Sequence, residues 1–311
     1  MKIFSGSSNE ELVKGICEHL GMSMGTVKLK TFPSGEKYAQ FQENIRGKDV
    51  FLVQSTSYPS NDNLMELLIM ADAAKRASAE KITAVIPYFG YSRQDRKEAP
   101  RVPISARLVM DMLELRVDRV VTMDLHADQV GGFWNKPFDH LHFTPSLIKA
   151  INGHGIDVIV APDVGSIKRT TTISDRLGLP MAVIAKRRLG DEKVEAQQFI
   201  GNVKKKNVLI VDDLTESAGT LIEASKECVN NGANSVSCAI THGCFTETGY
   251  SRLKEAFITK SISHLYVSNS VKTDFNWENE HEYITKVDVS SVFAKAILNI
   301  HNNASVSELF K

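Results

Sequence analysis

The stretch that decides the fold runs from Val208 to Thr220 and reads VLIVDDLTESAGT. Four apolar residues are followed by two adjacent carboxylates, a short loop with hydroxyls and a glycine, and the start of a helical pattern. The apolar run predicts a buried strand, and the backbone N–H groups at the start of the helix can bind a phosphate. Asp212 and Asp213 can hold sugar hydroxyls or Mg²⁺. The alternative interpretation is a pair of exposed acids beside an ordinary helix cap.

The alternation of strand and helix extends through the whole chain. Short apolar runs, separated by segments with helical periodicity, occur at residues 50–53, 82–86, 120–123, 158–160, 181–184, 208–211 and 236–240. Nearly continuous apolar strands that alternate with helices are typical of parallel sheets covered on both faces. We therefore predict an α/β fold of two similar domains, each a mainly parallel sheet flanked by helices. The expected domains are residues 1–144 together with the tail 300–311, and residues 145–299.

The composition excludes several classes of protein. The chain has 311 residues, and its 37 basic and 37 acidic side chains give a formal net charge of zero. A general nucleic-acid coat or a polybasic membrane anchor needs a long-range positive field, so neither is expected. No run of 18 apolar residues occurs, so we expect no membrane helix. A neutral surface offers little electrostatic protection against self-association, which favours an oligomer.

The cysteines and the N-terminus indicate a reducing compartment. The four cysteines form no CxxC pair, and the first residues lack the apolar stretch of a secretory signal. We expect buried free thiols and a cytoplasmic protein.

Three further segments carry polar residues just beyond an apolar run, where an open parallel sheet binds its ligands. Asp163 to Ser166 is followed by Lys168 and Arg169, which suits a diphosphate and its metal ion. Arg93, Gln94 and Asp95 can contact a polyphosphate, a base or a sugar. His126 can bind a metal or a phosphate oxygen. The alternative for Asp163 to Ser166 is an ordinary turn between a strand and a helix. For Arg93 to Asp95 it is a solvated charged loop, and for His126 a structural histidine.

A basic run follows the strand predicted at 181–184. Lys186, Arg187 and Arg188 precede the polar stretch 189–198, which has no clear period. We predict a mobile loop that brings positive charge to a transition state, with a solvated charge run as the alternative.

Taken together, these motifs resemble those of class I ribose-phosphate diphosphokinases over essentially the whole chain. The matching stretches include 2–8, 61–70, 93–95, 122–127, 211–213, 219–220 and 305–310. The 212–220 stretch also looks like the ribose-phosphate signature of the type I phosphoribosyltransferase fold. A Walker A loop is absent, which is consistent with a family that handles ATP on another scaffold.

The resemblance implies a Mg²⁺-dependent enzyme that converts ATP and ribose 5-phosphate to phosphoribosyl pyrophosphate and AMP. It implies that Lys186 and Arg188 are catalytic, and that Asp163, Val164, Gly165 and Ser166 form the diphosphate loop. Ribose 5-phosphate would be bound by Asp212, Asp213, Glu216, Ser217, Ala218, Gly219 and Thr220. ATP would be bound by Phe32, Glu36, Arg93, Gln94, Asp95 and His126, and Mg²⁺ by His126 and Asp163.

The resemblance also implies a homohexamer built from dimers, with phosphate and ADP acting at subunit interfaces. The segments that match the regulatory region contain Arg46, Arg101, Ser105, Ser305, Ser307 and Phe310. Two alternatives stay open: a catalytically inactive regulatory paralogue that binds the active synthetase, and a phosphoribosyltransferase that consumes the product.

Two loops depart from the family pattern. Glu216 and Ser217 stand where Asp-Thr is usual, and the longer acid would displace its carboxylate from the family position. Ser166 stands where a glycine is usual, and its side chain would disfavour a positive φ.

Overall fold

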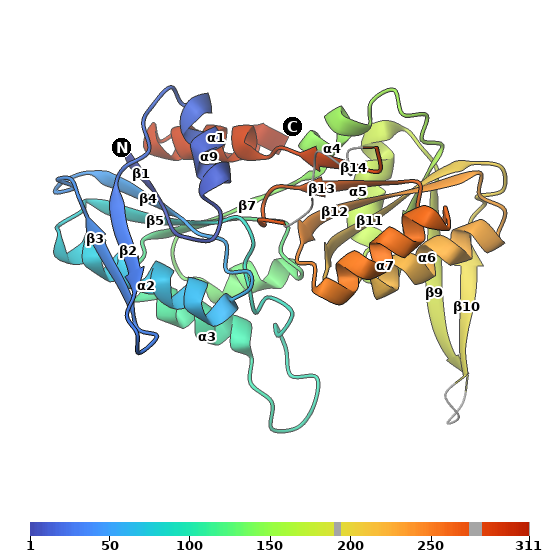
Figure 1. The fold of residues 1–311 in the computed structure, drawn as a ribbon, viewed down its shortest axis with the longest axis horizontal. Coiled ribbons are helices and arrows are strands. Elements are labelled where there is room, and N and C mark those ends of the chain that lie inside the picture. The colour runs from blue at the N-terminus through green and yellow to red at the C-terminus, as the bar shows by residue number, and fades with distance from the viewer. Residues whose placement is uncertain (190–193, 274–281, 311) are drawn as a thin grey trace. The chain divides into compact units, whose positions relative to one another are not determined.

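Two mainly parallel sheets, whose strands and helices follow in a similar order along the chain, form the core of the protein (Figure 1). The computed structural model describes residues 1–189, 194–273 and 282–310; for residues 186–189, 194–197 and 310 it describes the backbone alone. The chain divides into two compact units. Unit 1 comprises Met1–Phe143, Ser270–Lys272 and Asp288–Lys311, and unit 2 comprises Thr144–Asn269 and Thr273–Val287.

Unit 1 contains a five-stranded sheet and a separate two-stranded hairpin. Every adjacent pair in the order β1-β4-β5-β6-β7 is parallel, and β2 pairs with β3 antiparallel. Helices α1 and α9 cover one face of the sheet and α2 and α3 the other (Figure 1). The elements are β1 Lys2–Ser5, α1 Glu10–His19, β2 Val27–Thr31, β3 Lys37–Phe41, β4 Asp49–Val53, α2 Ser60–Arg76, β5 Lys81–Ile86, α3 Ser105–Glu114, β6 Arg119–Met123, the 3-10 helix η1 Asp128–Phe133, β7 Phe138–Leu141, α9 Ser290–His301 and the 3-10 helix η2 Ser307–Phe310.

Unit 2 contains a seven-stranded sheet. Its order is β10-β9-β8-β11-β12-β13-β14, and all adjacent pairs are parallel except β10 with β9. The elements are α4 Thr144–Ile151, β8 Val158–Ala161, α5 Ile167–Leu177, β9 Met181–Leu189, β10 Val194–Ile200, β11 Asn207–Thr215, α6 Gly219–Asn230, β12 Ser235–Gly243, α7 Glu247–Ile258, β13 His264–Ser268 and β14 Ile284–Val287.

The two units repeat one order of elements. In each, a first strand (β1 or β8) leads through a helix to an antiparallel hairpin (β2–β3 or β9–β10), and four further parallel strands then follow in order across the sheet. The predicted α/β class, with two similar and mainly parallel sheets flanked by helices, is confirmed.

The strands are buried on both faces because helices cover each sheet from both sides. In β11, Val208 and Ile210 pack into the same core cluster as α6 and α7, while Leu209 and Val211 are also buried but lie outside that cluster. Alternate residues of a strand point to opposite faces of the sheet, and both faces are buried here, so apolar residues are needed at consecutive positions. This explains why the sequence shows continuous apolar runs.

Two features differ from the expectations. Residues 288–299, predicted to lie in the second domain, belong to unit 1, because α9 packs against α1. The two helices lie close together, since a Cβ added at Gly15 of α1 would lie 3.0 Å from Ser290.

The stretch predicted as a mobile loop after residue 185 instead contains the strands β9 and β10, whose backbones pair from Val194 with Leu189 to Ile200 with Val183.

A buried carboxylate joins three elements of unit 1. Glu66 of α2 is 4% exposed, and its Oε1 accepts hydrogen bonds from the backbone and hydroxyl of Ser7 (both 2.7 Å) and from Nε2 of Gln54 (2.8 Å). It thereby ties α2 to the segment after β1 and to the end of β4.

Replacing Glu66 with alanine is expected to lower the free energy of unfolding by roughly 2–4 kcal/mol, because three donors would lose a charged acceptor inside the protein. Urea unfolding of the full chain measures this. Glu10→Ala is the matched control, since Glu10 forms only an exposed ion pair with Lys14 and should cost about 0.5 kcal/mol or less. A loss for Glu66→Ala as small as that of the control would contradict the prediction.

Candidate functional site

The loop from Asp163 to Ser166 forms a tight turn between β8 and α5. The hydroxyl of Ser166 donates to the Asp163 carbonyl oxygen (2.9 Å), and the Ser166 N–H donates to Oδ1 of the Asp163 carboxylate (2.9 Å). Ser166 has φ −85°, so this position needs no glycine. The departure from the family pattern is thus accommodated. The Ser166 hydroxyl also lies 3.1 Å from Oδ1 of Asp163, so the serine side chain helps to orient that carboxylate. Val164 and Gly165 are exposed.

Asp212 and Asp213 lie inside β11, which continues to Thr215, rather than just beyond the strand as predicted. The Asp213 N–H donates to Oδ1 of Asp212 (2.9 Å). Arg169 of α5 places Nη1 3.4 Å from Oδ1 of Asp213 and 3.9 Å from Oδ1 of Asp212. One guanidinium therefore faces both carboxylates.

Negative charge is crowded at this point. Burial raises the pKa of the Asp212 carboxyl well above its ordinary value, and the Asp213 carboxylate raises it further; Arg169 opposes the shift and Asp163 adds to it. Since β8 and β11 are neighbours in the sheet, the loop after β8 and the end of β11 bring three acids into one electrostatic environment. Such a cluster of oxygen donors suits a hard cation such as Mg²⁺.

The loop after β11 turns sharply into α6. Ala218 is fully buried and has φ +57°, a left-handed conformation, and α6 begins at the next residue, Gly219. Ser217 and Thr220 are exposed, while Glu216 is half-buried. A helix thus begins where the sequence predicted one, and anion binding at its start stays a prediction.

In unit 1, the predicted nucleotide residues Phe32 and Glu36 lie together at the turn of the β2–β3 hairpin. The Phe32 N–H donates to the Glu36 carbonyl oxygen (2.8 Å) and Phe32 is 40% exposed. Nζ of Lys30 lies 4.3 Å from the Phe32 ring and 4.7 Å from the Tyr38 ring. The hairpin thus presents an exposed aromatic ring whose position is supported by a cation and a second ring.

The segment Arg93–Asp95 follows β5 and is tied to its neighbours. The side chain of Gln94 accepts a hydrogen bond from the Ser105 hydroxyl, which starts α3, and Asp95 accepts one from Gln129 of η1. Ser105, predicted to be regulatory, therefore contacts a residue predicted to bind ATP. Arg93 is exposed, as is His126 after β6.

Unit 1 also contains a cluster of two histidines and a carboxylate that the sequence did not reveal. Ligand atoms of Asp124, His140 and His142 lie within 4.8 Å of one another, with Nδ1 of His142 3.3 Å from Oδ1 of Asp124. Nε2 of His140 accepts the Leu125 N–H (2.9 Å), so the cluster is held by protein contacts. His140 and His142 are two residues apart at the end of a strand, and this spacing places their side chains on the same face. It is the feature of the sequence that could have indicated the cluster.

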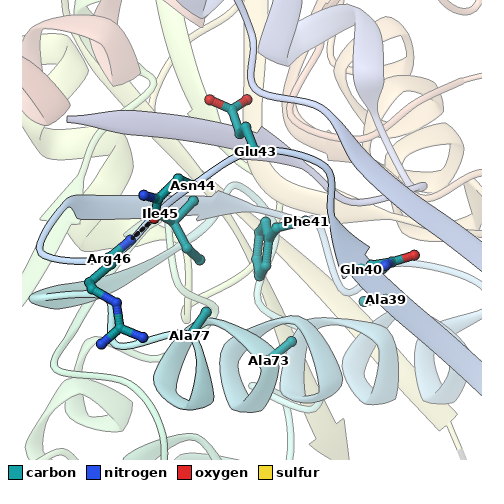
Figure 2. A pocket seen from close by; sticks show the side chains of 9 residues that line it. All are labelled: Ala39, Gln40, Phe41, Glu43, Asn44, Ile45, Arg46, Ala73 and Ala77. Carbon is teal, nitrogen blue, oxygen red and sulfur yellow. Dashed lines mark hydrogen bonds between the residues drawn. The ribbon is translucent and has the colours of Figure 1, made fainter.

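Arg46, predicted to be regulatory, lines a pocket of about 400 Å³ (Figure 2). The pocket lies between the end of β3 and α2 and is also lined by Phe41, Glu43 and Ala73. Nη1 of Arg46 donates to the Ser78 hydroxyl (3.1 Å).

The other predicted regulatory residues lie elsewhere in unit 1. Arg101 is exposed and has φ +64°. The Ser305 carbonyl oxygen accepts a hydrogen bond from Asn299 of α9 (2.7 Å), and Ser307 starts η2. The side chain of Phe310 lies outside the described residues.

The predicted catalytic residues Lys186 and Arg188 lie in β9, where their backbones pair with Gln197 and Glu195 of β10. Their side chains lie outside the described residues, so their catalytic role stays a prediction.

Over the part of the chain that the structure describes, no helix is long and apolar enough to cross a membrane. All four cysteines are free: Cys17, Cys228 and Cys238 are buried, and Cys244 is partly buried.

Comparison with known proteins gives matches over the full chain. Residues 1–116 match the model of the N-terminal domain of ribose phosphate pyrophosphokinase, and residues 191–311 match the phosphoribosyl synthetase-associated domain. The ribose-phosphate pyrophosphokinase of Fusobacterium nucleatum is 42% identical over 318 residues, which cover 100% of this chain and 98% of that protein. The ribose-phosphate pyrophosphokinase of Caldanaerobacter subterraneus is 43% identical over 317 residues, with the same coverage.

A solved structure is similar to this chain over almost its whole length. The crystal structure of phosphoribosylpyrophosphate synthetase from Mycobacterium smegmatis superposes with a TM-score of 0.89 at 34% identity, covering 97% of this chain and 99% of that one. With relatives above 40% identity along its whole length, the chain belongs to the ribose-phosphate pyrophosphokinase family.

Proposed function

We propose that this protein transfers the diphosphoryl group of ATP to the anomeric hydroxyl of ribose 5-phosphate, giving phosphoribosyl pyrophosphate and AMP for nucleotide, histidine, tryptophan and NAD biosynthesis. The anomeric hydroxyl loses its proton to the medium as its oxygen forms a bond to the β-phosphorus. The bond from that phosphorus to the α,β-bridging oxygen breaks, and AMP leaves with that oxygen. The observation that carries the proposal is the full-length match to enzymes of this name.

Unit 2 would bind the sugar phosphate. The loop of Glu216, Ser217, Ala218, Gly219 and Thr220 would hold the 5′-phosphate with its N–H groups and hydroxyls. Asp212 and Asp213 would accept hydrogen bonds from the ribose hydroxyls. The guanidinium of Arg169, which faces both acids, supports their placement.

The acids of this site fit Mg²⁺: burial and then the carboxylates of Asp213 and Asp163 raise the pKa of Asp212, and a bound cation would offset this crowded negative charge. His126 and Asp163 are the proposed protein ligands. When bound, Mg²⁺ would neutralise phosphate oxygens of ATP. The part played by Asp163 is to present a carboxylate oxygen whose orientation Ser166 fixes.

The nucleotide would be held by Phe32 and Glu36 on the hairpin and by Arg93, Gln94 and Asp95 after β5. An exposed ring suits a purine face, and a guanidinium suits a polyphosphate. The diphosphate would meet the loop Asp163–Ser166, and Lys186 and Arg188 would offset the charge that develops on the transferring group.

We further propose that the enzyme is cytoplasmic and works as a homo-oligomer, a hexamer built from dimers. Free thiols at all four cysteines support a reducing compartment. Arg46, Arg101, Ser105, Ser305, Ser307 and Phe310 would form its regulatory sites.

Two observations weigh against the alternatives. A phosphoribosyltransferase that consumes the product would need the loop of unit 2 but not a second unit with a similar order of elements. An inactive paralogue would not need to retain Asp163, Asp212 and Asp213 with the facing Arg169.

The test is an assay of purified protein with Mg²⁺, ATP and ribose 5-phosphate, followed by ³¹P NMR. Phosphoribosyl pyrophosphate and AMP are expected in equal amounts. A sugar phosphate that lacks the anomeric hydroxyl is the control and should give neither product. Absence of both products with the true substrate would overturn the proposal and favour the regulatory paralogue, and AMP without phosphoribosyl pyrophosphate would show hydrolysis instead.

A further inference from the structure

Three consecutive carbonyl groups of the phosphate loop are held by one neighbouring segment of unit 2. The Cys244 N–H donates to the Thr215 carbonyl oxygen (3.0 Å), and the Thr246 N–H donates to that of Glu216 (3.1 Å). Nη1 of Arg252, on α7, donates to the carbonyl oxygen of Ser217 (3.3 Å). The segment 244–252 thus holds the carbonyl side of residues 215–217.

The peptide geometry fixes where the N–H groups then point. In a planar trans peptide, the C=O of one residue and the N–H of the next lie on opposite sides. Since the carbonyls of residues 215, 216 and 217 face the segment 244–252, the N–H groups of Glu216, Ser217 and Ala218 face away from it. Successive N–H groups turned to one side, continuing into the start of α6, form an anion-binding concavity.

The segment lies in direct contact with the loop. A Cβ added at Gly249 would lie only 2.1 Å from the Glu216 carbonyl oxygen, so only glycine fits there without a shift of the backbone. The Thr246 side chain accepts the Gly249 N–H (3.2 Å), which caps α7 and fixes this approach. Nη1 of Arg252 also lies 3.5 Å from the position that a Cβ on Gly219 would take.

The peptide that joins Ser217 to Ala218 is the one that most needs support. Ala218 is held at φ +57°, which costs a residue with a side chain roughly 1–2 kcal/mol. Turning this peptide over would relieve the strain, but it would also point the Ser217 carbonyl oxygen at the bound anion. The Thr215 and Glu216 carbonyls are held by backbone N–H groups, and the Thr246 hydroxyl also donates to the Glu216 carbonyl oxygen (3.4 Å). The Ser217 carbonyl is held by the side chain of Arg252.

We infer that Arg252 is a positioning residue for the sugar-phosphate loop: its guanidinium holds the Ser217 carbonyl, so that the loop N–H groups face the 5′-phosphate of ribose 5-phosphate. The inference rests on the proposed function for the identity of the ligand. In this inference Arg252 acts through the loop rather than as a ligand of the substrate.

The test compares Arg252→Gln and Arg252→Lys with Lys226→Gln, which removes one exposed positive charge from α6. Titration calorimetry of the full-length protein measures the dissociation constant of ribose 5-phosphate, and kinetics measure KM for each substrate. Arg252→Gln is expected to raise the dissociation constant and KM of ribose 5-phosphate roughly tenfold, with KM for ATP within about twofold of wild type. Arg252→Lys should recover part of the loss, and Lys226→Gln should bind as wild type.

Equal binding by Arg252→Gln and wild type would overturn the inference. An equal loss of ribose 5-phosphate affinity in Lys226→Gln would also overturn it, because it would show a general effect of charge. An equal rise of KM for ribose 5-phosphate and for ATP in Arg252→Gln would overturn it as well. Because Arg252 is exposed, the melting temperature of the variants should stay within about 2 °C of wild type. If the wild-type protein binds ribose 5-phosphate but forms no AMP, the proposed function is refuted and the role of Arg252 is not. The calorimetric comparison of the variants still tests that role.

Discussion

Replacing Asp212 with asparagine is expected to make the ligand-free protein more stable and, at the same time, to raise KM for ribose 5-phosphate roughly 10- to 100-fold. The loss of affinity follows from replacing one acceptor oxygen of the proposed ribose site by an NH₂ group, which cannot accept a hydrogen bond from a ribose hydroxyl. The gain in stability follows from burial and the neighbouring carboxylates, which raise the pKa of Asp212 and so make its charge costly in the folded state.

The dependence on pH has a definite sign. A carboxyl whose pKa is higher in the folded state than in the unfolded state stabilises the fold at low pH and loses that contribution as the pH rises through its folded-state pKa. The stabilisation by Asp212→Asn should therefore grow as the pH rises through the folded-state pKa of the wild-type carboxyl, and should shrink as the pH falls below it. Asparagine keeps the oxygen that accepts the Asp213 N–H, so the backbone is not disturbed.

Calorimetric melting between pH 5 and pH 8, together with steady-state kinetics, checks both parts. A gain of about 1 kcal/mol corresponds to a rise of roughly 2–4 °C in Tm. Asp175→Asn is the matched control, because Asp175 is an exposed acid of α5, and it should change neither quantity. A lower melting temperature for Asp212→Asn, or an unchanged KM for ribose 5-phosphate, would contradict the prediction.

Replacing Lys186 or Arg188 with alanine is expected to lower kcat roughly 10²- to 10³-fold each, while both KM values change little. The reason is that charge develops on the diphosphoryl group as it moves, and cations fixed beside it stabilise the transition state more than bound ATP. The double variant should retain almost no AMP formation above background.

Lys204→Ala is the control for this pair, since Lys204 is an exposed lysine outside every proposed site. It should keep wild-type kcat. The circular dichroism and melting temperature of each variant show whether the fold is intact. If both single variants keep kcat within threefold of wild type, Lys186 and Arg188 are not catalytic.

The repeated apolar runs were enough to predict the α/β class and the parallel sheets, because burial on both faces requires apolar residues at consecutive positions. The run at 208–211 indeed lies in β11, and the loop after it leads into α6 as expected. Local sequence was a poorer guide to the ends of elements. Asp212 and Asp213 continue β11 because Asp212 and Leu214 still pair with β12, a contact that depends on a segment more than twenty residues away.

The hairpin β9–β10 shows the same limit. Residues 189–198 have no clear apolar period, and a loop was predicted. The two strands are held by backbone pairing with each other and, through β9, with β8. Pairing of this kind uses N–H and C=O groups that every residue has, so side-chain periodicity need not reveal it.

The sequence by itself determined the alternation of strand and helix, the start of a helix after the loop that follows β11, and the acids that precede that loop. These features follow from residues that are neighbours in the chain. Only the tertiary structure decided that Arg169 faces both Asp212 and Asp213, that α9 returns to pack on α1, and that Arg252 supports the Ser217 carbonyl. The physical reason is that these contacts join segments distant in sequence. Which segments meet is set by the burial of whole helix and sheet faces, and no local pattern of residues encodes it.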